Sequence, residues 1–297
     1  MYSIVMGFRD NYKEYGYTTI YSLLENNQGY FFSIYILSDN LDFDYFKGLE
    51  QQFSCEIIPI SVTVSDIKNI DCGYLTFGTL IRLLIGQYIP KDIDSILYLD
   101  ADLIINDDIH ELMSTELDEY YAAVVKSNVS KKHLKALRVH SEHYFNAGVI
   151  LFNLRTCRKD IIFQRAIELL HKKKFKYLDQ DVLNIILENN VKYIDSKWNF
   201  DSFRAKSLVL NGRLKEKKSG AIIYHYTGLD KPWNMLCQNP FKNVYRKYYC
   251  YRLKYNLVNN ATLIYRIKLK LTGVLYKCPV TRGVINFVRN CIRSNID

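Results

Sequence analysis

The sequence predicts an α/β domain with a mixed, mostly parallel sheet flanked by helices, followed by a basic and aromatic C-terminal extension. Three observations lead to this prediction. Short apolar runs alternate with stretches of helical periodicity through the first 240 residues, which is typical of strands joined by helices. Of the 297 residues, 48% are hydrophobic and 24% are charged, which excludes a globally disordered chain. The charge balance then changes sharply near residue 240.

The predicted elements begin at the start of the chain. The first strand, residues 2–6, is an apolar run that breaks at Gly7, and the first helix, residues 12–24, ends at Glu-Asn-Asn-Gln-Gly. A helix over residues 75–89 stops before Pro90. Further strands are expected at residues 31–37, 55–64, 95–99, 121–126, 148–154, 191–194 and 221–226. Further helices are expected at residues 42–53, 161–174 and 179–188.

Charge is distributed unevenly along the chain. Residues 241–297 contain 12 Lys or Arg and one Asp, net +11, whereas residues 1–240 contain 28 basic and 30 acidic residues, net −2. We therefore predict a folded body over residues 1–240 and a separate C-terminal region over residues 241–297. Because the body is nearly neutral, we expect no nucleic-acid partner. The patterns GxxxxGK[ST] and GxGxxG are absent, which disfavours ATPases and NAD-dependent enzymes.

The cysteines and the N-terminal segment predict a cytoplasmic location. The seven cysteines form no CxxC pair, and their odd number suits a reducing compartment better than a disulfide framework. The first residues have no basic segment ahead of a long apolar run, so we expect no signal peptide. No run of about 18 apolar residues occurs, so we expect no membrane-spanning helix.

Two carboxylates end the apolar strand predicted at residues 95–99. Asp100 and Asp102 are separated by Ala101, so an extended chain places both carboxylates on the same side. Carboxylates that close repel each other unless a cation or a proton lies between them. A hard cation such as Mg²⁺ or Mn²⁺ prefers oxygen ligands and can bridge to phosphate. The alternative is a solvated turn, in which aspartate is common.

A second candidate segment follows the strand predicted at residues 221–226. His225 ends this strand, Gly228 permits a tight turn whose amides can approach a phosphate, and Lys231 is a compact positive charge. The alternatives are a hydrogen-bonded core histidine and a solvated lysine. Ligands of parallel sheets bind beyond the carboxyl ends of the strands. One site is therefore predicted from residues 7–12, 100–102 and 225–231.

Two further segments could line the same site. Ala147 and Gly148 are small, so a ligand can approach the backbone closely, although a tight packing corner explains them equally well. Asp179 can cap the helix predicted to begin there. Asp179 and Gln180 could instead bind sugar hydroxyls.

The four segments together, YLDAD, FNAGV, DQDVLN and HYTGLDKPW, resemble glycosyltransferase family 8 in their order and spacing. This group of retaining enzymes includes bacterial lipopolysaccharide α-galactosyl- and α-glucosyltransferases and glycogenin. The resemblance extends over residues 1 to about 238, including residues 4–12 and 78–82. It implies a single GT-A fold, a UDP-sugar donor (UDP-galactose or UDP-glucose), Mn²⁺ or Mg²⁺ as cofactor, and transfer of a hexose with retention to a glycan acceptor in lipopolysaccharide, capsule or glycoprotein assembly.

The resemblance also implies a role for each matching residue. The implied metal ligands are Asp100, Asp102 and His225. The implied donor-binding residues are Gly7, Asp10, Asn11, Tyr12, Arg82, Ala101, Asn146, Ala147, Gly228 and Lys231. The implied catalytic residues are Gln180 and Asp179. The sequence departs from the family at Arg9, where members often have an acidic or small polar residue, so uracil recognition is not carried over to that position.

The chemistry of these residues favours one mechanism for the implied reaction. Charge on the departing UDP would be stabilised by the metal and by Lys231. The amide of Gln180 is a poor nucleophile, so we expect attack from the front face of the sugar, with Gln180 orienting the reactants. The alternatives are a UDP-sugar hydrolase or phosphotransferase with the same metal site, and a non-catalytic protein that binds nucleotide sugars or membranes.

The C-terminal region mixes Lys and Arg with Tyr, Phe, Leu and Ile throughout residues 241–297. Basic and aromatic amphipathic segments suit an anionic membrane surface, which predicts peripheral contact with the inner face of the cell membrane and a lipid-linked acceptor. A basic subdomain packed on the body is the alternative. The pattern fits helix and strand equally well.

Overall fold

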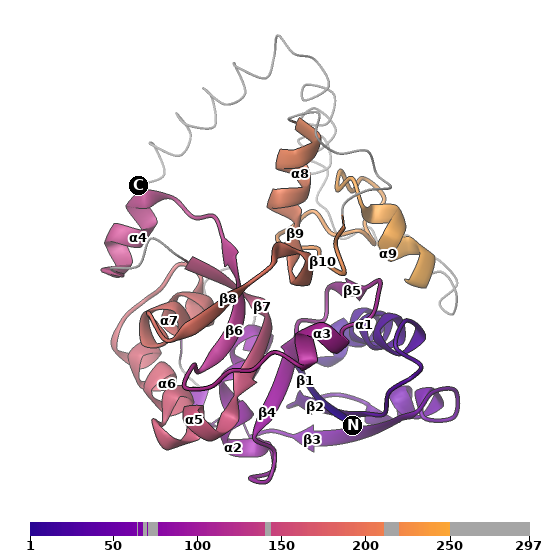
Figure 1. Cartoon of the computed structure of the whole chain (residues 1–297), viewed down its shortest axis with the longest axis horizontal. Coiled ribbons are helices and arrows are strands. Elements are labelled where there is room, and N and C mark those ends of the chain that lie inside the picture. Colours follow the sequence, from indigo (N-terminus) through magenta and orange to yellow (C-terminus); the bar gives the residue numbers. More distant parts are fainter. Residues whose placement is uncertain (64, 68–69, 71–76, 140–143, 211–219, 250–297) are drawn as a thin grey trace. The chain divides into compact units, whose positions relative to one another are not determined.

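The computed structural model describes residues 1–63, 65–67, 70, 77–139, 144–210 and 220–249 (Figure 1). The chain divides into two compact units. The first unit comprises Met1–Phe200 and Gly220–His225, and the second comprises Asp201–Ser219 and Tyr226–Asp297. The division by charge near residue 240 stays a prediction.

The first unit is built on a seven-stranded sheet in the order β3-β2-β1-β4-β7-β6-β8. Its strands are β1 (Tyr2–Gly7), β2 (Phe32–Ser38), β3 (Cys55–Ser61), β4 (Ser95–Leu99), β6 (Ala122–Ser127), β7 (Tyr144–Asn153) and β8 (Val191–Ile194). β7 runs antiparallel to both of its neighbours, and all other pairs are parallel. The prediction of a mixed, mostly parallel sheet is therefore confirmed.

Helices cover both faces of this sheet (Figure 1). The α-helices are α1 (Lys13–Glu25), α2 (Ile85–Tyr88), α3 (His110–Met113), α4 (Lys131–Leu137), α5 (Leu154–Lys159), α6 (Ile162–Lys172) and α7 (Leu178–Ile186). The 3-10 helices are Asp10–Tyr12, Phe43–Leu49, Ser65–Ile67, Phe77–Leu84 and Ser196–Trp198. α2, α5, α6, α7 and Phe77–Leu84 pack on one face, and α1, α3 and Phe43–Leu49 pack on the other.

Alternation along β4 shows how one strand contributes to both cores. Ile96 and Tyr98 lie in the cluster with α6 and α7, whereas Leu97 and Leu99 lie in the cluster with α1. All four side chains are buried. A central strand covered on both faces is therefore a continuous run of apolar residues. Asp100, directly after this run, is the first residue past the buried part of β4 that is partly exposed to solvent.

A second, smaller sheet has the order β5-β10-β9. It consists of β5 (Leu103–Ile105), β10 (Ile223–His225) and β9 (Phe200–Asp201). β5 and β10 are antiparallel, and His225 lies opposite Leu103. This register brings the histidine beside the turn that joins β4 to β5.

The structure differs from the predicted elements in several respects, among them the 3-10 form of Phe43–Leu49, where a helix over residues 42–53 was expected. The helix expected at residues 75–89 is, in its described part, the 3-10 helix Phe77–Leu84 followed by one turn, α2. β7 begins at Tyr144, so Asn146 and Ala147 lie inside a strand rather than ahead of one. Several elements were not predicted: the short elements α3, α4, α5 and β5, in which stretches of three to seven residues show too little periodicity, and the longer helices α8 (Ser202–Leu210) and α9 (Lys242–Tyr249).

The second unit contains α8 (Ser202–Leu210) and α9 (Lys242–Tyr249). Tyr245 of α9 stacks edge-on against Tyr226 at 5.3 Å between ring centroids and contacts Trp233 at 5.4 Å. The first residues of the basic region are thus helical, and residues 250–297 lie outside the described part. Within the described residues, the structure has no helix that is both long and apolar enough to span a membrane.

Candidate active site

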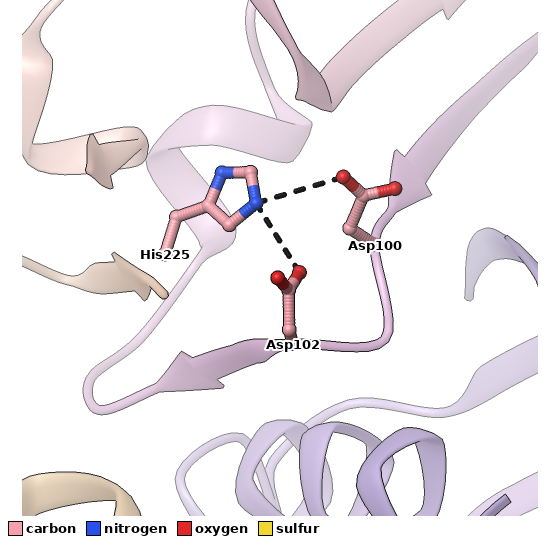
Figure 2. Close-up of side chains that lie close together, drawn as sticks. All are labelled: Asp100, Asp102 and His225. Atoms are coloured by element: carbon pink, nitrogen blue, oxygen red, sulfur yellow. Dashed lines mark ion pairs between the residues drawn. The ribbon is translucent and has the colours of Figure 1, made fainter. Parts of the chain in front are cut away.

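The first unit brings together, at the edge of the sheet, three side chains that could hold a metal ion, Asp100, Asp102 and His225, here called the metal cluster. Asp100 follows β4 directly, Asp102 precedes β5, and His225 ends β10. His225 Nε2 lies 3.5 Å from Asp100 Oδ2 and 3.2 Å from Asp102 Oδ1, so the ring points one nitrogen at both carboxylates (Figure 2). One ligand atom from each residue lies within 4.8 Å of the others. Two carboxylate oxygens and an imidazole nitrogen at this spacing fit a divalent cation.

Arg82 fixes the orientation of Asp100. Asp100 Oδ1 accepts hydrogen bonds from Arg82 Nη2 at 2.8 Å and from the Tyr98 hydroxyl at 2.7 Å, while its other oxygen, Oδ2, faces His225. The guanidinium also lies 4.6 Å from the centroid of the Tyr98 ring. Arg82 is only 4% exposed, so its direction is set by these contacts.

Arg82 also joins the metal cluster to α7. Its Nε lies 2.8 Å from Asp179 Oδ2, and both side chains are buried. Burial alone lowers the pKa of the guanidinium, but the carboxylates of Asp100 and Asp179 outweigh it and hold that pKa above its ordinary value. Burial raises the pKa of Asp179 to about 6 against the opposing effect of Arg82, so the carboxyl is ionised at neutral pH.

The net negative charge of the four ionisable side chains at this site favours a divalent cation. Three carboxylates (Asp100, Asp102 and Asp179) and one guanidinium (Arg82) give these four groups a net charge of −2. Buried charge that is not compensated destabilises a folded protein. A doubly charged cation between Asp100 and Asp102 would neutralise the group.

Gly148 on β7 provides the space that the ligands occupy. A Cβ at this position would lie 2.1 Å from His225 Cε1 and 2.6 Å from Asp100 Oδ2. The carbonyl of Gly148 accepts a 2.9 Å hydrogen bond from the backbone N–H of Asp100. Of the two explanations left open for the small residues here, close approach of a ligand and a tight packing corner, the structure shows close packing, against the side chains of two proposed metal ligands.

Thr19 on α1 holds the turn between the two aspartates. Its hydroxyl lies 3.0 Å from the carbonyl oxygen of Ala101 and 2.9 Å from that of Leu103, and it accepts a hydrogen bond from Leu103 N–H at 3.2 Å. Thr19 is completely buried. One side chain therefore fixes the backbone on both sides of Asp102.

Comparison with known proteins identifies the family. The model of glycosyl transferase family 8 matches residues 3–237. The chain belongs to this family.

Relatives of the family 8 chain include two lipopolysaccharide enzymes. It is 29% identical over 269 residues to a lipopolysaccharide 1,2-glucosyltransferase of Escherichia coli, covering 82% of this chain and 78% of that protein. It is 29% identical over 210 residues to a lipopolysaccharide 1,3-galactosyltransferase of Salmonella typhimurium, covering 66% and 61%. The chain is thus a glycosyltransferase.

A solved structure shows the same fold. The crystal structure of the galactosyltransferase LgtC with donor and acceptor sugar analogs matches with a TM-score of 0.73 at 23% identity, covering 84% of this chain and 95% of that one. The predicted GT-A fold is confirmed.

Several predicted donor-binding residues of the family 8 chain connect to the metal cluster. Asn146 Nδ2 and the backbone N–H of Ala147 both donate to Gln180 Oε1, at 3.0 and 3.1 Å. Arg82 Nη1 donates to the carbonyl of Ala147 and Nε pairs with Asp179. β7, α7 and the helix Phe77–Leu84 therefore supply one connected group.

The residues after β1 lie at the same edge of the sheet as Asp100, because β1 and β4 are parallel neighbours. A Cβ on Gly7 would lie 2.8 Å from Ile81 Cγ2, so the glycine lets the helix Phe77–Leu84 pack closely. Asp10, Asn11 and Tyr12 form the 3-10 helix that follows, and Asp10 pairs with Lys13 at 3.0 Å. Arg9 pairs through Nε with Asp39 Oδ1 at 3.0 Å.

Gly228 and Lys231 belong to the second unit. Gly228 has a φ of +78°, a conformation that favours glycine. Lys231 Nζ donates to the carbonyl of Tyr226 at 2.8 Å and lies 5.6 Å from the centroid of the Trp233 ring. Their contact with a diphosphate stays a prediction.

Sequence reasoning missed three residues: Tyr98 and Asn199, which hydrogen-bond to Asp100 and His225, and Thr19, which holds the backbone on both sides of Asp102. Thr19 and Tyr98 look like ordinary members of a helix and a strand. Asn199 follows a buried tryptophan, and nothing in its neighbours marks it as a partner of a distant histidine.

Proposed function

We propose that this family 8 enzyme transfers galactose or glucose from a UDP-sugar to a glycan acceptor in lipopolysaccharide, capsule or glycoprotein assembly, with retention at the anomeric carbon. The observation that carries the proposal is the cluster of Asp100, Asp102 and His225, with Arg82 oriented against it. Two relatives, a lipopolysaccharide glucosyltransferase and a lipopolysaccharide galactosyltransferase, support a hexose donor that is either glucose or galactose.

Asp100 Oδ2, Asp102 Oδ1 and His225 Nε2 would hold the metal ion, Mn²⁺ or Mg²⁺. When bound, the ion would stabilise negative charge on the departing diphosphate. Arg82 keeps Asp100 turned toward the ion, since it binds the opposite oxygen of that carboxylate. Gly228 and Lys231 would contact the diphosphate, and Asn11 and Tyr12 the uracil.

The contacts of Gln180 support attack from the front face of the sugar. Its Oε1 accepts two hydrogen bonds, from Asn146 Nδ2 and from the N–H of Ala147. A carbonyl oxygen has two lone pairs, so both are engaged and neither is presented as a nucleophile. The other candidate nucleophile, Asp179, is buried and paired with Arg82. Isolation of a covalent sugar adduct on Gln180 or Asp179 would contradict this mechanism.

The acceptor is proposed to be lipid-linked, with the enzyme in the cytoplasm and in peripheral contact with the membrane. The support is the net charge of +11 over residues 241–297. The proposed contact region is residues 241–297, and because Tyr245, Tyr248 and Tyr249 of α9 are buried, the deletion that tests it removes only the segment 250–297. Deletion of that segment should abolish binding to anionic vesicles at low salt and leave UDP-sugar hydrolysis unchanged. Full-length protein that ignores such vesicles would contradict the proposal.

The activity is tested with a panel of UDP-sugars in the presence of Mn²⁺, with UDP release measured with and without a chelator and with and without a glycan acceptor. We expect release from UDP-galactose or UDP-glucose that the chelator abolishes and the acceptor accelerates. Free hexose as the product even with acceptor present would instead indicate a hydrolase. Undiminished release in chelator would contradict the metal site.

A further inference from the structure

We propose that Asn199 is a positioning residue that fixes the His225 imidazole in the tautomer required for metal binding. This inference rests on the metal site proposed above. Asn199 is 1% exposed and follows the 3-10 helix Ser196–Trp198, whose buried tryptophan belongs to the apolar core on the α1 face of the large sheet. His225 Nδ1 lies 2.9 Å from Asn199 Oδ1, on the side of the ring opposite the carboxylates.

Two backbone N–H groups determine which way the buried amides point. The N–H of Gly148 donates to Asn146 Oδ1 at 2.9 Å, and the N–H of Ala147 donates to Gln180 Oε1 at 3.1 Å. A backbone N–H can only donate, so each of these contacts identifies an amide oxygen. Asn146 Nδ2 then donates to Gln180 Oε1 at 3.0 Å, in agreement with both assignments.

The same reasoning determines the orientation of the Asn199 amide and the position of the proton on the His225 imidazole. Asn146 Oδ1 can only accept, so Asn199 presents Nδ2 to it, at 3.0 Å. Asn199 Oδ1 must therefore face His225, and an amide oxygen requires the proton on Nδ1. The lone pair of the neutral ring is then on Nε2, the atom that faces Asp100 and Asp102.

Beyond Gln180, each side chain again donates a hydrogen bond to the next one. Gln180 Nε2 donates to the Tyr144 hydroxyl at 3.0 Å, and this hydroxyl donates to Asp181 Oδ1 at 2.5 Å. Asp181 is fully buried and also accepts from the backbone N–H of Tyr177 at 2.9 Å. Each donor in this series of hydrogen bonds from His225 to Asp181 thus has an acceptor, and the last acceptor is the Asp181 carboxylate.

The imidazole of a metal-ligating histidine is commonly held by a partner on its second nitrogen, and loss of that partner weakens metal binding roughly 10–100-fold. The Asn199→Leu variant removes the acceptor for Nδ1–H. The Asn199→Asp variant retains it, because a carboxylate oxygen accepts the same hydrogen bond, although its second oxygen then opposes Asn146 Oδ1. The expected order of metal affinity is wild type, then Asn199→Asp, then Asn199→Leu.

Asn27→Leu is the matched control. Asn27 is 3% exposed and its side chain donates to Leu23 O and accepts from Ile109 N–H, so the variant loses similar buried hydrogen bonds away from the metal cluster. Mn²⁺ binding to the full chain is measured by the electron paramagnetic resonance of the free ion, with and without UDP. We expect Asn199→Leu to bind Mn²⁺ roughly 10–100-fold more weakly and Asn27→Leu to bind it as the wild type does.

A tautomer measurement provides a second readout. In the Mg²⁺-loaded protein, long-range ¹H–¹⁵N spectra should show the His225 proton on Nδ1 in the wild type and in Asn199→Asp. If Asn199→Leu does not fold, Asn199→Ser, whose side chain is too short to reach the ring, takes its place.

Three results would each overturn the inference alone. The first is equal Mn²⁺ affinity of wild type and Asn199→Leu, and the second is an equal loss of Mn²⁺ affinity in Asn199→Asp and Asn199→Leu. The third is a His225 proton on Nε2. A wild-type protein that takes up no Mn²⁺ even with UDP would overturn the metal site together with it.

Discussion

Substitution of Gly148 by alanine tests whether the metal ligands sit where the structure places them. Carbon atoms normally approach to about 3.5–4.0 Å. A Cβ at this position would lie 2.1 Å from His225 Cε1 and 2.6 Å from Asp100 Oδ2, so the imidazole must move by about 1.4 Å or more. Metal–ligand distances tolerate deviations of only about 0.2 Å. The alanine variant should therefore lose at least one ligand.

The size of the effect follows from this displacement. A misplacement of about 1 Å in a catalytic group costs about 10²-fold in rate. Overpacking of a buried site destabilises by about 1–3 kcal/mol, which leaves the chain folded if the free energy of unfolding is in the ordinary range. We therefore expect Gly148→Ala to fold, to bind Mn²⁺ weakly, and to release UDP at least about 100-fold more slowly.

The assay compares Gly148→Ala with Gly29→Ala, which is the matched control because a Cβ on Gly29 would meet nothing within 4 Å. Mn²⁺ affinity, UDP release and urea denaturation are measured for both. Wild-type Mn²⁺ affinity in Gly148→Ala would refute the reasoning, since His225 and Asp100 could not then occupy the positions from which the site is built. Loss of activity in Gly29→Ala would show that any glycine substitution has the same effect.

Three further predictions follow from the same group of residues. Asp102→Asn should abolish Mn²⁺-dependent UDP release with an unchanged circular dichroism spectrum; residual metal-dependent turnover near the wild-type rate would contradict its role as a ligand. Thr19→Val leaves the buried N–H of Leu103 without its acceptor and should lower the free energy of unfolding, measured by urea denaturation, by about 1–3 kcal/mol. Unchanged stability would contradict the role of Thr19 in holding the backbone beside Asp102. Burial raises the pKa of Asp179 from 3.8 to about 6, so the native state binds more protons than the unfolded state between these values. The metal-free wild type should lose stability relative to Asp179→Asn as pH rises from 3.8 to about 6, with no further change above, and a rise over that interval would contradict the shift.

The main elements and the grouping of Asp100, Asp102 and His225 were predictable because their signals are local. The strand before Asp100 is an uninterrupted apolar run, and two acids one residue apart at its end are a recognisable pattern. β1, β4 and β8 lie where the apolar runs predict them, to within one residue. His225 could be included because it ends another apolar run and because its segment matches the family pattern.

The geometry around the ligands was not predictable, because it depends on contacts between residues far apart in the chain. β5 has three residues, too few to recognise, yet its antiparallel pairing with β10 is what brings His225 beside Asp102. The 3-10 form of Phe77–Leu84 is equally hidden, since an α-helix would bury the same apolar side chains. The role of Asn199 depends on a hydrogen bond to a residue 26 positions away.

A crystal structure of the full chain with Mn²⁺ and UDP measures the central claim most directly. The account predicts one Mn²⁺ ion bound by Asp100 Oδ2, Asp102 Oδ1 and His225 Nε2, with diphosphate oxygens completing its coordination and the Nδ1 of His225 still hydrogen-bonded to Asn199. An ion bound elsewhere, or these three side chains turned away from a common centre while UDP is bound, would contradict it.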